Sequence, residues 1–286
     1  MLQQLRRDLL RVGLLGALVI LLLSGVSWAQ ARPPATTPRP RSRAVAGPVR
    51  DAEALAEARR LYNLGRYEAA IEVAATIGEH SATRQQALLV LGRSRLERFR
   101  ETSAEGDLAQ GRAELVGIDA SRLSERERIE LVVGLGQALF LDNEFRAAAE
   151  VFTSALDHAM ALGAHARDQL IDWWATALDR YAQTRAVTDR PAIYDRLVEF
   201  TEQELRRDAG AASASYWQAA ALRLRGDVER AWDAALAGWV RALLTPDRGA
   251  ALRLELDALV RDGIVPDRAR RFSGAGQDPE QIAAAM

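Results

Sequence analysis

The sequence predicts an all-α protein, an α-solenoid of about five helix-turn-helix repeats with a C-terminal capping helix. Two observations lead to this fold class. Apolar residues recur with a period near 3.6 from Asp51 onward, and no alternating strand pattern interrupts them. Polar turns centred at Gly65, Asn143 and Gly226 lie 78 and 83 residues apart. Each gap is about twice the length of a helix-pair repeat, which leaves room for one more divergent unit between successive turns.

Residues 1–31 are predicted to be an export signal. Arg6, Arg7 and Arg11 precede an apolar stretch at residues 12–26, and Ala29-Gln30-Ala31 offers a small-x-small cleavage site. The apolar stretch has 15 residues, fewer than the roughly 20 that span a bilayer. We therefore expect a periplasmic or secreted bacterial protein. The alternative is an uncleaved inner-membrane anchor formed by residues 12–26.

The next segment, residues 32–50, is predicted to be an extended tether. It contains five Pro and five Arg and no acidic residue, and proline at this density prevents helix formation. Residues 51–263 form the predicted repeat domain. Residues 264–286 are rich in glycine and charge and are predicted to be disordered.

The first two helix pairs follow the tether. The first pair turns at residues 63–66. The second opens at Thr83, with Gln86 three residues on as a capping-box partner. The connection at residues 100–106 looks longer than the turn of the first pair.

The later pairs begin with the most regular unit, residues 124–155. Ser124 and Glu127 predict a capping box there. The fourth pair is less regular, and its second helix is expected to start near Pro191. A fifth pair surrounds Gly226. The expected capping helix opens at Thr245-Pro246 and stops at Gly263.

Composition excludes several kinds of chemistry. The chain has no Cys and no Lys, so all 38 basic residues are Arg. Disulfides, thiol nucleophiles, Schiff bases and the lysine of nucleotide-binding loops are therefore ruled out. The formal net charge of −1 provides no electrostatic footprint for nucleic acid. We expect no nucleic-acid partner, and membrane contact only through an uncleaved N-terminus.

The sequence gives no enzyme signal, and we expect no catalytic residue, cofactor or metal. His80, His158 and His165 lack metal-ligand spacing and are expected at the surface. No Gly-x-Ser-x-Gly element is present for Ser-His-Asp catalysis. A hydrolase on a helical-repeat scaffold remains a minor alternative.

Three units share a pattern of small and large residues. It comprises Ala58, Leu61, Gly65, Tyr67 and Ala70, then Gly136, Leu139, Asn143, Phe145, Ala148, Phe152 and Ala155, and then Ala219, Leu222, Gly226, Val228 and Ala231. This pattern resembles the tetratricopeptide repeat (TPR) family over about residues 51–244. The proline that usually closes each repeat of the family is missing, and the second and fourth units are too divergent to align. A neighbouring helical-repeat family is the alternative.

The resemblance implies a right-handed superhelix whose first helices line a concave groove. Helix packing would then depend on Gly65, Ala70, Gly136, Ala148, Ala155, Gly226 and Ala231. The residues expected to face the groove are Arg59, Tyr62, Asn63, Arg93, Glu97, Gln137, Phe140, Tyr216 and Arg223. Such a groove is suited to an extended or helical peptide held by aromatic and Arg anchors.

Five of the six Trp lie between Trp173 and Trp239. Trp232 and Trp239, seven apart, are expected to fill a packing seam. Packing is also favoured for Trp173, Trp174, Tyr216 and Trp217, with a glycan-stacking platform as the alternative. The expected function is a non-catalytic scaffold or adaptor that binds another envelope protein or peptide. The alternative function is a glycan-binding module, with peptidoglycan as its partner.

Overall fold

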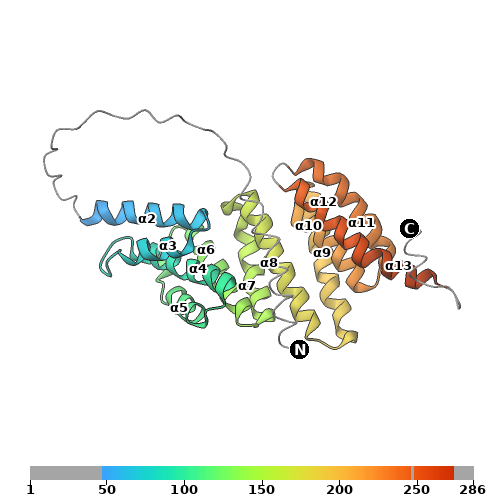
Figure 1. Cartoon of the computed structure of the whole chain (residues 1–286), viewed down its shortest axis with the longest axis horizontal. Helices are drawn as coiled ribbons and strands as arrows, with labels where there is room; N and C mark the ends of the chain where they lie inside the picture. Colours follow the sequence, from blue (N-terminus) through green and yellow to red (C-terminus); the bar gives the residue numbers. More distant parts are fainter. Residues whose placement is uncertain (1–46, 246–247, 274–286) are drawn as a thin grey trace.

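The computed structural model describes residues 47–245 and 248–273, and these residues form helices and no strands. The predicted signal at residues 1–31, residues 32–46 of the tether and residues 274–286 of the tail lie outside the described residues. Figure 1 shows the helices following one another along the long axis, from α2 at one end to α13 at the other. No described helix is both long and apolar enough to span a membrane.

The helices pack in consecutive pairs. The pairs are α2 (Gly47–Asn63) with α3 (Tyr67–Ala75), α4 (Arg84–Thr102) with α5 (Glu105–Val116), α6 (Glu125–Leu141) with α7 (Phe145–His158), α8 (Ala164–Gln183) with α9 (Arg190–Arg207), and α10 (Ala212–Arg225) with α11 (Val228–Arg241). Because α2 begins at Gly47, residues 47–50 of the predicted tether are helical. The all-α prediction is confirmed for the described residues.

The turns of the first, third and fifth pairs share one backbone geometry. Gly65, Asn143 and Gly226 have φ of +69°, +66° and +94°. At each turn this residue donates its N–H to the carbonyl three residues earlier, and the next residue donates to the carbonyl five residues earlier. Both bonds satisfy carbonyls that the helix end leaves free, as in a Schellman cap. The three positions proposed from sequence are therefore structurally equivalent.

The small residues of the pattern lie between the helices of these pairs. Ala70, Ala148, Ala155 and Ala231 are buried, as are Ala58 and Ala219 on the first helices. A Cβ placed on Gly136 would lie 2.5 Å from Cε1 of Phe152. Bulk is therefore excluded at this position, as the sequence pattern predicts.

The second pair is closed differently from the other pairs. α4 runs to Thr102 and α5 starts at Glu105, so the expectation of a long connection is wrong. The reason is Ser103, which adopts a left-handed conformation with φ of +58° and reverses the chain. A Cβ on Gly92 would lie 3.0 Å from the Gly111 carbonyl oxygen, and one on Gly111 would lie 2.9 Å from the Gly92 oxygen. The two backbones approach closely because both positions lack a side chain.

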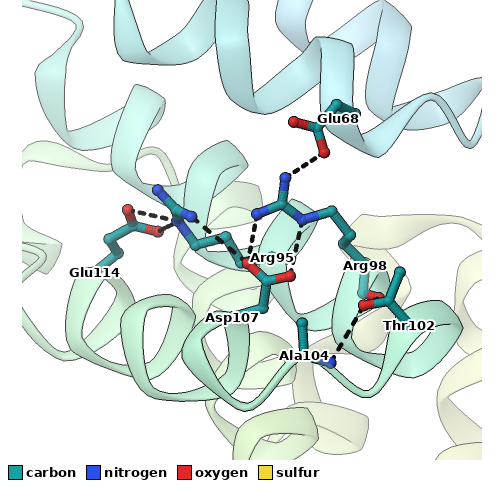
Figure 2. Close-up of polar contacts among 7 residues, drawn as sticks. All are labelled: Glu68, Arg95, Arg98, Thr102, Ala104, Asp107 and Glu114. Atoms are coloured by element: carbon teal, nitrogen blue, oxygen red, sulfur yellow. Dashed lines mark hydrogen bonds and ion pairs between the residues drawn. The ribbon is translucent and has the colours of Figure 1, made fainter.

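A polar network also joins α3, α4 and α5, as Figure 2 shows. Asp107, in the first turn of α5, accepts hydrogen bonds from Nε and Nη2 of Arg98 at 2.8 and 2.5 Å. Arg98 also pairs with Glu68 of α3, and Arg95 binds Glu114 at 3.0 Å. Asp107 is only 5% exposed, whereas Arg95 and Arg98 are half-buried and Glu68 is exposed. This network links α4 to α5, the helix pair whose apolar sequence pattern is weakest.

The two predicted capping boxes have different outcomes. At Ser124 the box is confirmed, since Ser124 and Glu127 each accept from the other's backbone N–H. At Thr83 it is wrong, because the Thr83 side chain makes no cap hydrogen bond. Gln86 instead donates to the Arg122 carbonyl at 3.1 Å. The Gln side chain thereby ties α4 to the segment before α6.

The C-terminal helix is longer than predicted and starts later. α12 (Gly249–Leu259) does not begin at Thr245-Pro246, and Pro246 lies outside the described residues. It does not stop at Gly263 either, because a π-helical turn (Val260–Ile264) carries it into α13 (Val265–Phe272). Pro266 occupies the first turn of α13, where it needs no N–H partner. The predicted disorder from residue 264 is therefore wrong for residues 265–272.

The core runs the length of the chain in adjoining clusters. The largest extends from Ile129 of α6 to Ile264 and includes Phe152, Trp174 and Leu256. A smaller cluster joins α2 and α3 to α4, and another centres on Leu115. Each cluster draws on successive pairs, so the pairs stabilise one another across their shared faces.

Candidate binding surface on the first helices

The first helices of the pairs form a continuous surface. We call α2, α4, α6, α8 and α10, together with α12, the first-helix face. Each of these helices packs against the next in the row, whereas the second helices of successive pairs approach one another less closely. Long Arg side chains bridge the second row, as Arg196 does to Glu150 and Arg230 to Glu202. The unequal spacing indicates that the row of helices curves toward the first-helix face.

A cleft of about 320 Å³ opens on this face between α2, α4 and α6. Four of the residues expected in a groove line it, namely Arg59, Tyr62, Asn63 and Arg93. Leu89 and Val90 of α4 complete the wall on one side, and α6 contributes Arg126, Glu127 and Glu130. The residues that α6 contributes belong to its first turns, so the capping box at Ser124 sets their position.

Ion pairs cross this cleft. Arg59 of α2 pairs with Glu127 of α6, so the first helices of the first and third units meet directly. Arg126 binds Glu130 at 3.1 Å. Arg93 lies 3.6 Å from the same Glu130, which is too long for a hydrogen bond. Glu130 thus lies between two guanidinium groups, hydrogen-bonded to Arg126 through one oxygen and ion-paired with Arg93 through the other.

Arg93 is held by an aromatic ring. Its guanidinium carbon lies 4.8 Å from the centre of the Tyr62 ring, a cation–π geometry. Its Nε is buried and has no hydrogen-bond partner among the described residues. Burial raises the pKa of Tyr62, so the phenol stays neutral and can donate a hydrogen bond. The Tyr62 ring therefore fixes the position of this cation in the cleft wall, and its buried Nε makes no hydrogen bond among the described residues.

Aromatic residues occupy the middle of the first-helix face. Arg100 lies over the Trp173 ring at 5.0 Å, and Phe140 packs edge-on against the same ring at 5.2 Å. Glu97 is nearly buried and forms an ion pair with Arg100. Gln137 is 5% exposed, and its Oε1 has no partner among the described residues. The expectation that Gln137 faces an open groove is wrong, because neighbouring side chains cover it.

A second cleft, of about 280 Å³, lies between α10 and the C-terminal helices. Tyr216 and Arg223, both expected in a groove, line it together with Glu255 and Asp262. Arg223 is neutralised by Asp267 of α13 at 2.6 Å. Burial raises the pKa of Tyr216 to about 12 and also raises the pKa of Glu255. The two clefts gather six of the nine expected groove residues, and neither contains Glu97, Gln137 or Phe140.

Asp168 and Asp172 form an acidic group beside the second cleft, although neither was among the residues expected in a groove. Asp168 accepts hydrogen bonds from the Ser213 amide at 2.9 Å and from Arg248 at 2.7 Å. Asp172 accepts from the Trp217 indole at 2.9 Å. The Asp172 side chain reaches solvent, yet protein encloses it on the other sides, and this desolvation raises its pKa. The four-residue spacing of Asp168 and Asp172 could have indicated a shared helix face.

The tryptophans are not arranged as a stacking platform. Trp174 and Trp217 are 2% and 8% exposed, so their faces are not available to a ligand. This agrees with the favoured packing interpretation. Trp232 packs against the core, but Trp239 is 42% exposed and lies against Arg253. The predicted burial of Trp239 in a packing seam is therefore wrong.

The three histidines are exposed, and none of them lines either cleft. Among the described residues, no group of three His, Cys, Asp or Glu is placed to hold a metal ion. The arrangement offers charged, aromatic and apolar contacts to a ligand. Comparison of the chain with known protein families and with curated proteins finds no match.

Proposed function

We propose that this protein is a TPR-like α-solenoid that serves as a non-catalytic scaffold or adaptor. In this proposal its first-helix face binds a peptide segment of another cell-envelope protein. The repeat assignment is supported by the equivalent left-handed turns at Gly65, Asn143 and Gly226. The observation that carries the binding function is the cleft between α2, α4 and α6, which Arg59, Tyr62 and Arg93 line together.

An elongated ligand suits the surface better than a small molecule. The two clefts lie on the same row of helices, and both combine charged side chains with apolar or aromatic ones. Helix-lined grooves commonly take peptides that insert a few anchoring side chains. Arg and Tyr dominate such contacts because they combine a large apolar area with directional hydrogen bonds.

The cellular location in this proposal is periplasmic or secreted, and it rests on the sequence of residues 1–31. An inner-membrane anchor formed by residues 12–26 would place the same face outside the cytoplasm. Sequencing the N-terminus of the exported protein distinguishes the two, since cleavage leaves Arg32 as the first residue.

Affinity capture from envelope extract tests the function. The double variant Arg59→Ala with Arg93→Ala removes both cations from α2 and α4 at the cleft. Arg60→Ala is the matched control, because Arg60 neighbours Arg59 but pairs with Glu57 outside the cleft. We expect one dominant partner with the wild type and the control, and its loss with the double variant. Equal recovery from all three proteins would exclude this cleft as the binding site.

A glycan ligand is less well supported, because Trp174 and Trp217 are buried. Of the four residues in that alternative, only Trp173 and Tyr216 retain partial exposure. Co-sedimentation with purified peptidoglycan checks this directly. We expect the protein to stay in the supernatant, and binding to the glycan would revive the alternative.

A further inference from the structure

Helix α11, near the C-terminal end of the row in Figure 1, carries an apolar stripe on its solvent side. The stripe begins on α11 and continues into the short 3-10 turn Ala242–Leu244, and each of its side chains exposes between 42% and 73% of its surface. Residues three and four positions apart share one side of a helix, so these side chains form one surface. We call it the α11 stripe, and it consists of Leu236, Trp239, Val240, Leu243 and Leu244.

The other second helices have no such stripe. Among the described residues, α3, α7 and α9 carry no exposed large apolar side chain, and α5 carries only Val116 at its last position. The π-helical turn joins α12 and α13 into one helix, so no second helix follows beside α11 in the described part of the chain. Single exposed apolar residues are normal on a protein surface, whereas a cluster indicates a contact surface.

The α11 stripe can pair with a second copy of itself. From residue 234 to residue 244 the only charged residue is Arg241, and its Nη1 is buried. No row of like charges therefore opposes the contact of two stripes. When two α11 helices pack antiparallel around Val240, Leu236 of one copy lies beside Leu244 of the other. A two-fold axis produces this arrangement, because it brings the same surface of both copies together.

The size of the α11 stripe fits a small dimer interface. Five large apolar side chains at this exposure form a patch comparable with the largest on ordinary monomers, which measure about 300–600 Å². Two such patches and the polar side chains around them reach roughly 1,200 Å² of buried surface, where stable specific interfaces begin. The contact is therefore large enough for a reversible dimer.

We propose that this protein forms a two-fold homodimer through the α11 stripe. The stripe lies on a second helix and faces solvent, so the first-helix face of each copy stays uncovered. The dimer presents two first-helix faces, which strengthens binding to any partner that carries two matching segments. Dimerisation does not depend on which ligand the first-helix face binds, so it stands or fails separately from the proposed function.

Sedimentation velocity of the purified exported protein over a range of concentrations tests the proposal. We expect a monomer that converts to a dimer as the concentration rises. Leu243→Glu and Val240→Glu should each raise the dissociation constant at least about tenfold, because they bury a charge in the contact. Val187→Glu is the matched control, since Val187 is exposed to the same 73% as Leu243 but lies outside α11. The control should dimerise as the wild type does, and circular dichroism should show all three variants folded.

Crosslinking supplies a second measurement, because the chain has no cysteine. A cysteine introduced by Val240→Cys lies near the two-fold axis and should give a disulfide-linked dimer on mild oxidation, whereas Val187→Cys should not. A wild-type protein that stays monomeric at about 100 μM would overturn the proposal. So would a dimer that neither Glu variant weakens. A monomer that binds phospholipid vesicles through the α11 stripe would also overturn it, since the occupant would then be a membrane.

Discussion

Gly136 of α6 faces the ring of Phe152 on α7 so closely that a Cβ would lie 2.5 Å from Cε1. The equivalent pairs in the first and fifth units are Ala58 with Ala74 and Ala219 with Ala235, all buried. The third unit therefore places one large and one absent side chain where the other two units use two methyl groups. The missing side chain at Gly136 provides the space that the Phe152 ring fills, as close packing requires.

The contact between Gly136 and Phe152 predicts that the effect of Gly136→Ala on the free energy of unfolding changes sign in a double-mutant cycle. Gly136→Ala in the wild type should lower the free energy of unfolding, because overpacking costs about 1–3 kcal/mol and the better helix propensity of Ala returns only about 1. In a Phe152→Ala background the same substitution should be stabilising, because the ring no longer occupies the space. Urea unfolding measures both steps. Gly136→Leu should destabilise more than Gly136→Ala, and equal effects of Gly136→Ala in the two backgrounds would refute the contact.

The left-handed turns predict that adding a side chain at a turn glycine lowers stability. Gly226→Ala should destabilise by about 1–2 kcal/mol, because an L-residue at φ of +94° strains its Cβ against the backbone. Gly106→Ala in α5 is the control, since nothing lies within 4 Å of the new Cβ and φ is not positive. It should be neutral or stabilising by up to about 1 kcal/mol. Thermal unfolding that ranks the two variants in the opposite order would show that the turn register is wrong.

Asp107 should make the free energy of unfolding depend on pH in the acid range. Hydrogen bonds from Arg98 hold the pKa of Asp107 below its ordinary value of 3.8 despite partial desolvation. A depressed pKa in the folded state means that the stabilisation is present above about pH 4 and is lost as the pH falls through the folded pKa. Asp107→Asn should cost about 2–3 kcal/mol at pH 7.

The same comparison at low pH completes this test. The difference between wild type and Asp107→Asn should shrink when urea unfolding is repeated below pH 4. Glu57→Gln removes an exposed ion pair with Arg60 and should change stability little at either pH. A difference for Asp107→Asn that does not depend on pH would show that the loss comes from packing and not from charge.

Asp172 should show the opposite pH dependence. Although its side chain reaches solvent, desolvation by the surrounding protein raises its pKa even though the Trp217 indole donates a hydrogen bond to it. A raised pKa means that the folded state binds this proton more tightly than the unfolded state does. The stabilisation from Asp172 is therefore present at low pH and is lost as the pH rises through the folded pKa. Asp172→Asn should therefore raise the melting temperature at pH 7, because Asn can still accept the indole hydrogen bond. The gain should vanish near pH 4, and a lower melting temperature at pH 7 would contradict it.

Local patterns were sufficient to predict the helix pairs. The turns at Gly65, Asn143 and Gly226 and the capping box at Ser124 depend on residues close in sequence, so their signals were visible in it. The second pair was harder to predict because its turn uses Ser103 in a conformation that Ser adopts rarely. The ion pair between Arg98 and Asp107 was not predicted either, because charged residues in such a pattern are typical of an ordinary solvated helix face.

The site was predictable only in part. Arg59, Tyr62 and Arg93 line one cleft, as their equivalent positions in neighbouring repeats predict. This equivalence failed for Gln137, which is only 5% exposed, because helical periodicity does not predict which side chains cover a polar residue. The continuation of the last helix to Phe272 was also hidden, because Gly263 and Pro266 indicate a helix end, whereas a π-helical turn carries the chain into α13.

Site-specific photocrosslinking in the native envelope tests the central claim most directly. A benzophenone amino acid is placed at Asn63, which is exposed at the rim of the first cleft, and separately at Glu72, which is exposed on the second helix α3. We predict one discrete protein adduct from Asn63 and none from Glu72. The same adduct from both positions, or an adduct from Glu72 alone, would contradict binding at the first-helix face.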